Sequence, residues 1–167
     1  MVQNPPPVEN EPVKTNAVRT LDQQKIAYRL VPYAVDEDDL SAETVAQKIG
    51  LAPERVFKTL AAKGDKTGVL LAVIATPQSL DLKALAAVSG NKRCELLPLK
   101  DVQPVTGYVR GGVSPIGTKK RFPVYLDEAA RPFDEISISA GMRGLQVLLA
   151  PEDLARATGA TWSVVGK

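Results

Sequence analysis

Lys58 is the residue whose type and surroundings most directly suggest chemistry. In an extended strand it shares a face with Leu60 and Ala62, whereas its neighbours Phe57 and Thr59 point the other way. A lysine among apolar side chains can line a pocket and direct its ammonium group at a ligand oxygen or phosphate. The alternative is a lysine at the mouth of the strand whose ammonium group simply reaches water. The pattern alone favours that alternative.

A glycine-rich loop is the second candidate. Gly111 to Gly117 places three glycines in seven residues, and such a backbone exposes N–H groups that can hold an oxyanion or a phosphate. Ser114 precedes Pro115, which predicts an extended residue with an available hydroxyl. The spacing is neither that of a P-loop nor that of a dinucleotide-binding fingerprint. An ordinary irregular loop therefore stays open as the alternative.

Small polar residues lie close to two further glycines. Ser137 and Ser139 alternate with isoleucines, so one face of a predicted strand is polar, and that strand leads to Gly141 and Gly144. The arrangement fits a site where a substrate approaches the sheet closely. An exposed strand face explains it equally well. Gln146 follows the turn, and its amide could donate to a substrate carbonyl.

Basic residues flank the glycine-rich loop. Arg110 precedes it, and Lys119, Lys120 and Arg121 follow it directly. Beside a pocket, these side chains could hold backbone phosphates, with binding that weakens steeply as the salt concentration rises. A solvated surface is the more common explanation of such a run. The acidic segment 36–39 looks like a loop with charge at a helix start, and we assign it no catalytic role.

Two counts restrict the chemistry. There is no histidine among the 167 residues, which excludes Ser-His-Asp and Cys-His nucleophile pairs and histidine-based zinc sites. The single cysteine, Cys94, cannot form an internal disulfide or a thiolate metal site, and it is best explained as a small buried residue in a strand. We therefore expect no metal and no cofactor, and catalysis by positioning, backbone dipoles, lysine charge or groups that the substrate brings.

Composition indicates an ordinary globular protein, with 44% hydrophobic and 24% charged residues. The longest apolar run, Val69 to Ala75, is far shorter than the roughly 20 residues that cross a bilayer, and the first residues do not resemble a secretory signal. We expect a cytoplasmic protein with no membrane partner. The net charge of +2 is compatible with an RNA partner but does not identify one.

The chain pattern predicts one domain over residues 14–167, preceded by a disordered, proline-rich tail over residues 1–13. Strands and helices are interleaved, and the hairpin at Gly64 to Gly68 requires antiparallel pairing. We therefore expect an α/β (α+β) fold with a mixed, barrel-like β-sheet surrounded by helices. The expected helices are 15–24, 41–50, 81–90, 100–106 and 151–159, and the expected strands are 28–35, 57–63, 69–76, 93–97, 122–126, 135–139, 145–149 and 161–165.

Four segments occur together in one order: Arg55 to Leu60, Thr106 to Arg121, Ser139 to Gln146 and Leu149 to Leu154. With these motifs the chain resembles the YbaK/EbsC family, free-standing relatives of the editing domain inserted in bacterial prolyl-tRNA synthetase. The resemblance covers about Thr15 to Val165 and is far more specific than any single motif.

The resemblance implies hydrolysis of the ester that links a wrong amino acid to the terminal adenosine of tRNA. Lys58 corresponds to the strand lysine that the family requires, and Gly111, Gly112 and Ser114 would steady the developing oxyanion. Aminoacyl-tRNA is the implied partner, joined in some members by prolyl-tRNA synthetase. The remaining substrate-binding residues that we expect are Tyr33, Phe57, Thr59, Gly112, Val113, Pro115, Ser139, Gly141 and Gln146, and tRNA-binding is expected of Arg110, Lys119, Lys120 and Arg121.

The Gly-Gly-x-Ser-Pro loop followed by Lys-Lys-Arg is similar to the cysteine-specific branch of the superfamily. In that branch the cysteine thiol attacks its own ester carbonyl, and placement alone can contribute roughly 7–11 kcal/mol. The resemblance thus implies deacylation of Cys-tRNA(Pro). The alternatives are a deacylase for alanine or another small amino acid, and a non-catalytic module that binds tRNA or a synthetase.

Overall fold

The computed structural model describes residues 14–167. The predicted disordered tail, residues 1–13, lies outside the described residues. Within them, each predicted helix and strand is present with small shifts at its ends.

Local capping signals determine the helices. Thr15, Ser41 and Asp81 each accept a hydrogen bond from the backbone N–H three residues later, and Gly50 and Gly90 adopt the left-handed conformation that ends a helix. The helices are α1 (Asn16–Gln23), α2 (Ala42–Ile49), α3 (Leu82–Ser89), α4 (Leu99–Thr106) and α5 (Pro151–Thr158), with short 3-10 helices η1 (Pro53–Arg55) and η2 (Glu128–Ala130). Within residues 14–167 no helix is long and apolar enough to span a membrane.

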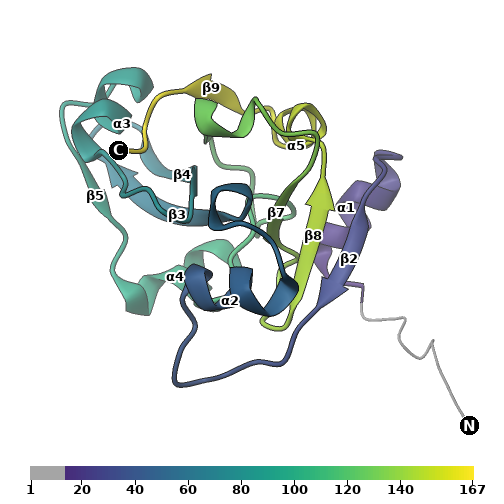
Figure 1. Ribbon diagram of the computed structural model, residues 1–167. Helices are drawn as coiled ribbons and strands as arrows, with labels where there is room; N and C mark the ends of the chain where they lie inside the picture. Colours follow the sequence, from purple (N-terminus) through teal and green to yellow (C-terminus); the bar gives the residue numbers. More distant parts are fainter. Residues whose placement is uncertain (1–13) are drawn as a thin grey trace, which may run out of the picture.

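The strands form two sheets (Figure 1). The smaller sheet has the order β2-β8-β7 and is antiparallel, with β2 at its edge, as Pro32 predicts. The larger has the order β5-β3-β4-β6-β9, with antiparallel pairing on both sides of β3 and parallel pairing from β4 to β9. The bounds are β2 (Arg29–Pro32), β3 (Phe57–Gly64), β4 (Gly68–Ala75), β5 (Cys94–Leu96), β6 (Val124–Asp127), β7 (Ile136–Ser139), β8 (Leu145–Leu149) and β9 (Thr161–Ser163).

The mixed α/β fold is confirmed, but the expectation of a barrel-like sheet needs correction. The two sheets in residues 14–167 meet at a single parallel bridge between Val56 and Ser137, so they do not close into a barrel. Beyond that bridge, one edge of β3 has no strand partner until β5 begins to pair at Ala62. The incomplete closure leaves an opening beside β3.

Alternating residues of β4 pack into two separate hydrophobic cores. Leu71 and Val73 join the main core, which includes residues of β7, β8, α1 and α5. Leu70 and Ile74 face a smaller core that includes residues of α3 and the buried Cys94. Because β3 follows the same alternation, its two faces have different surroundings. This places Lys58 and Thr59 on opposite sides of the larger sheet.

Candidate functional site

A cavity of about 350 Å³ occupies the opening beside β3. Its floor is the strand segment Val56 to Ala61, and β8 contributes Gln146. The loop after α4 contributes Arg110, Gly111 and Val113. The cavity thus brings together residues from three of the four predicted motifs, and these residues are up to 90 positions apart in the chain.

Lys58 lies in this cavity and is half-buried. Its Nζ donates a hydrogen bond of 3.1 Å to the carbonyl oxygen of Thr76, just beyond the end of β4. No carboxylate of residues 14–167 forms an ion pair with it. The carbonyl fixes the ammonium group in place without neutralising its charge, so the charge stays available to an oxygen of a ligand.

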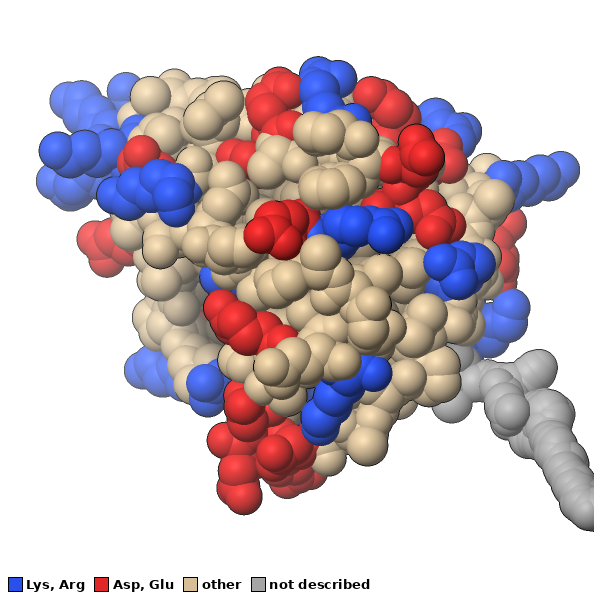
Figure 2. Space-filling model, viewed as in Figure 1, with Lys and Arg blue, Asp and Glu red and all other residues tan. Residues whose placement is uncertain are grey.

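The cavity is electropositive because its lining contains two cationic residues, Lys58 and Arg110, and no acidic residue. Acidic side chains gather instead at the lower edge of the face in Figure 2, over the segment between β2 and α2 in Figure 1. That segment carries exposed Asp36 to Asp39, and hydrogen bonds from Thr44 and Ser41 lower the pKa of Asp39. Asp39 thus holds the start of α2, in agreement with its assignment as helix-start charge.

The glycine-rich loop is held from within by Tyr108. Its hydroxyl donates to the carbonyl oxygens of Ile116, at 2.7 Å, and Gly117, at 3.0 Å. Burial raises the pKa of Tyr108 to about 12, so the hydroxyl remains a donor at neutral pH. This contact fixes the far end of the loop while Gly111 and Val113 reach the cavity.

Position 112 leaves no room for a side chain, so it requires glycine. A Cβ atom there would lie 2.9 Å from the carbonyl carbon of Met142 and 3.0 Å from the backbone nitrogen of Arg143. The Gly112 N–H is already used, since it donates to the carbonyl oxygen of Val109 at 2.8 Å. Gly112 therefore allows the loop to pack against the β7–β8 turn and does not offer its N–H to the cavity.

Ser114 and Pro115 do not line the cavity. Ser114 is fully buried, and its Oγ accepts a hydrogen bond of 3.2 Å from the Ile116 N–H. The hydroxyl, which the sequence predicted to be available, is therefore buried inside the loop and does not reach the cavity. Pro115 lines a separate hollow of about 170 Å³, together with Arg121.

Ser139, Gly141 and Tyr33 also lie outside the lining. Ser139 and Gly141 are at the β7–β8 turn behind the loop, whereas Tyr33 directly follows β2 and contacts that turn. The Ser139 Oγ accepts from the Gly141 N–H at 3.1 Å, and a Cβ on Gly141 would lie 2.9 Å from the Tyr108 ring. The Tyr33 N–H donates to the carbonyl oxygen of Gly144 at 2.9 Å. These residues shape the turn against which Gly112 packs.

Gln146 is buried and lines the cavity. Its Oε1 accepts a hydrogen bond of 2.7 Å from the hydroxyl of Ser137, which lies on β7. The amide nitrogen has no hydrogen-bond partner among the described residues. Ser137 thus orients the side chain so that Gln146 can donate to a ligand.

The basic run after the loop has its own contacts. Lys119 Nζ donates to the carbonyl oxygen of Pro104, and Lys120 lies 5.8 Å from the centre of the Phe122 ring. Arg121 lies against Gly159 at the end of α5. All three side chains are exposed and outside the cavity, whereas Arg110 lines it.

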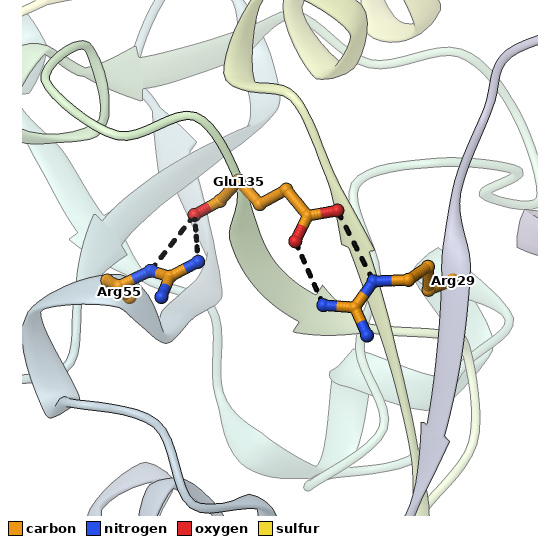
Figure 3. Close-up of polar contacts among 3 residues, drawn as sticks. All are labelled: Arg29, Arg55 and Glu135. Atoms are coloured by element: carbon orange, nitrogen blue, oxygen red, sulfur yellow. Dashed lines mark hydrogen bonds and ion pairs between the residues drawn. The ribbon is translucent and has the colours of Figure 1, made fainter.

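A network of two arginines and a glutamate connects β2, η1 and β7 (Figure 3). Arg55 donates twice to the backbone oxygen of Glu135, at 3.2 Å each, and Arg29 Nη2 donates to the Glu135 carboxylate at 2.9 Å. The hydrogen bond from Arg29 is the main reason that the pKa of Glu135 is lowered. The network fixes the segment that leads into β3 and thereby the start of the cavity floor.

The apolar wall of the cavity was not predicted from the sequence. Leu96 and Leu99 line it and are 53% and 59% exposed, joined by Leu40 and Val102. The available signal was a leucine-rich segment between a strand and a helix, which resembles ordinary core. Within residues 14–167 no group of three His, Cys, Asp or Glu side chains could hold a metal ion.

Residues 36–157 match the family model of the aminoacyl-tRNA editing domain, and the chain belongs to this family. It is 54% identical over 139 residues, 83% of this chain and 85% of the relative, to the Enterococcus faecalis protein named "Putative Cys-tRNA(Pro)/Cys-tRNA(Cys) deacylase EbsC". It is 30% identical over 143 residues, 83% of this chain and 84% of the relative, to the "Multifunctional Ser/Thr-tRNA deacylase ProXp-y" of Escherichia coli (strain K12).

Solved structures share the fold. One is described as a "putative trans-editing enzyme for prolyl tRNA synthetase", with a TM-score of 0.81 and 24% identity over 91% of this chain and 95% of that one. Another is the hypothetical protein APE2540, with a TM-score of 0.84 and 20% identity. The match covers 92% of this chain and 100% of that one.

Proposed function

We propose that this protein hydrolyses mischarged aminoacyl-tRNA, with Cys-tRNA(Pro) as its principal substrate. The observation that carries the proposal is Lys58, an ammonium group without an ion-pair partner among the described residues, in a cavity that has apolar walls. Membership of the editing-domain family and the 54% identity to the E. faecalis protein support the substrate class.

Lys58 would bind an oxygen at the ester or at the terminal ribose phosphate of the tRNA. The Gly111 and Val113 N–H groups have no partner within residues 14–167, and both residues line the cavity. They are better donors to the developing oxyanion than the Gly112 N–H, which already donates to Val109, and the Ser114 hydroxyl, which is buried outside the cavity lining. The predicted roles of Gly112 and Ser114 thus become positioning roles in this proposal.

The substrate itself supplies the nucleophile. The cysteine sulfur forms a bond to the ester carbonyl carbon, the bond from that carbon to the ribose oxygen breaks, and the thiol proton passes to the ribose oxygen. Water then adds to the carbonyl carbon of the resulting thiolactone, the C–S bond breaks, and free cysteine leaves. The protein contributes placement and charge stabilisation, which needs no histidine.

The tRNA backbone would contact Arg110 at the cavity and the exposed Lys119, Lys120 and Arg121 beyond it. Prolyl-tRNA synthetase as a further partner, and a cytoplasmic location where both would be met, are parts of the same proposal. One relative acts on Ser- and Thr-tRNA by its name, so serine joins alanine among the alternative amino acids.

The test measures release of labelled amino acid from tRNA(Pro) charged with cysteine, alanine or serine. We expect rapid release of cysteine by the wild type and a loss of about 100-fold or more in Lys58→Ala. Lys63→Ala is the matched control, because Lys63 lies on the same strand, exposed and outside the cavity. Faster release of alanine or serine would change the substrate. No release from any of the three would leave a non-catalytic binding module.

A further inference from the structure

The cavity lies against an open edge of β3. This strand pairs with β4 along its whole length, but with β5 only from Ala62 to Gly64. On the same side it meets β7 only at the bridge from Val56 to Ser137. The stretch between these two neighbours borders the cavity, and Thr59 is at its middle.

The hydrogen-bond pattern shows which way the Thr59 backbone faces. The Val56 carbonyl oxygen accepts from the Thr76 N–H beside β4, whereas the Ala61 carbonyl oxygen accepts from the Leu97 N–H on the β5 side, both at 2.9 Å. Backbone groups alternate in direction along a strand. Thr59, two residues before Ala61, therefore directs its N–H and its C=O away from β4 and toward the open edge.

Neither of these two groups has a partner in the part of the chain that the structure describes. A buried backbone donor or acceptor without a partner is costly, and an open strand edge is a template for pairing. The cavity at Thr59 thus offers one donor and one acceptor, side by side, from a rigid strand.

We propose that the aminoacyl group of the substrate pairs with the backbone of Thr59, as one residue of an antiparallel strand would. Its α-amino group donates to the Thr59 carbonyl oxygen, and its ester carbonyl oxygen accepts from the Thr59 N–H. Opposite residues of an antiparallel pair exchange the same two hydrogen bonds. This inference rests on the proposed function and names how that site recognises its amino acid.

The pairing explains which part of the substrate is held. The Thr59 N–H would polarise the same ester carbonyl that the thiol attacks, adding to the donors of the glycine-rich loop. The substrate side chain would lie on the Thr59 face of the sheet, with Phe57 and Ala61, because paired residues share a face. Lys58 faces the opposite side and remains free to bind the ribose or phosphate.

Thr59→Pro tests the donor. Proline removes the N–H, and at an outward-facing edge position it removes no hydrogen bond between strands. Thr59→Val is the matched control: it keeps the N–H and removes only the side-chain hydroxyl, which is buried without a partner in the described residues. We expect Thr59→Pro to hydrolyse Cys-tRNA(Pro) at least about 100-fold more slowly than Thr59→Val, because only the proline variant lacks the N–H. Full activity in Thr59→Pro, or equal losses in both variants, would overturn the inference.

A substrate analogue tests the acceptor in the unaltered protein, independently of how Thr59→Pro folds. 3-Mercaptopropionyl-tRNA keeps the thiol and the ester but lacks the α-amino group. We expect the wild type to cleave it with kcat/KM lower by about 10-fold or more than for Cys-tRNA(Pro), since one hydrogen bond is lost. Equal values would overturn the inference and leave the proposed function intact. A wild type that cleaves neither ester would mean failure of the proposed function itself.

Discussion

The hydroxyl of Ser137 donates a hydrogen bond of 2.7 Å to the side-chain oxygen of Gln146 on the neighbouring strand. Both side chains are buried, and only Gln146 reaches the cavity. Ser137 is therefore a positioning residue, because it determines which end of the amide faces a ligand.

Ser137→Ala should release the Gln146 amide. We expect a rise in KM that exceeds any fall in kcat, and a destabilisation of about 1–3 kcal/mol because the buried Oε1 loses its donor. Steady-state kinetics and urea unfolding measure the two effects. Ser137→Thr keeps a hydroxyl and should restore KM. Unchanged kinetics in Ser137→Ala would show that the orientation of Gln146 does not matter.

Gly112→Ala should displace the glycine-rich loop. The added Cβ would meet the Met142 backbone at 2.9 Å, and backbone cannot yield as a flexible side chain can. We expect a fall in kcat/KM together with a lower melting temperature. Gly90→Ala is the control, because its Cβ would meet no atom within 4 Å and only the left-handed backbone is strained, by roughly 1–2 kcal/mol. Loss of activity in both variants would point to stability alone.

Tyr108→Phe should weaken the far end of the same loop. Two carbonyl oxygens lose their shared donor, which we expect to cost about 1–3 kcal/mol at neutral pH. The pKa of Tyr108 is raised from 10.0 to about 12 in the folded protein, so the protonated hydroxyl stabilises the fold fully below pH about 10. That contribution is lost as the pH rises from 10 toward 12. Unfolding measured across this range should show a shallower alkaline decline in Tyr108→Phe than in the wild type.

Glu135→Gln should change how the free energy of unfolding depends on pH under acidic conditions. The pKa of Glu135 is lowered by the hydrogen bond from Arg29, so the carboxylate stabilises the fold above its unfolded pKa of about 4.3 and loses that effect as the pH falls below it. The variant should unfold with a flatter dependence on pH below about 4.3. Arg55 donates to the backbone oxygen of Glu135, and that contact should survive the substitution. The same dependence of unfolding on pH in the two proteins would contradict a stabilising role of the Glu135 carboxylate.

Local signals allowed most elements to be predicted. Ser41 and Gly50 mark the two ends of α2 in the sequence, and they do so in the structure because a cap depends only on neighbouring residues. The hairpin at Gly64 to Gly68 is local for the same reason. Pairing between distant strands has no such signal, so the two separate sheets were not foreseen.

The site was predicted as a set of motifs rather than as a surface. Lys58 and Gly111 do meet at one cavity. The inward direction of Ser114 could not be read from its neighbours, because the burial of the loop depends on Tyr108 and on a turn some 30 residues later. The same holds for Thr59, whose open backbone edge results from where β5 stops pairing.

The pairing of β2 with β8 also sets the order of events on the ribosome. Roughly 110 residues separate Pro32 from its partner Leu145, and at bacterial or eukaryotic elongation speeds their synthesis takes on the order of ten seconds. Until then the β2 segment has no strand partner. Its proline and the charge of Arg29 oppose pairing with another chain, which would lead to aggregation. Gln146 emerges at the same late stage, so a nascent chain already carrying Lys58 has no complete cavity. The cavity is therefore complete only after the chain has been translated beyond Gln146.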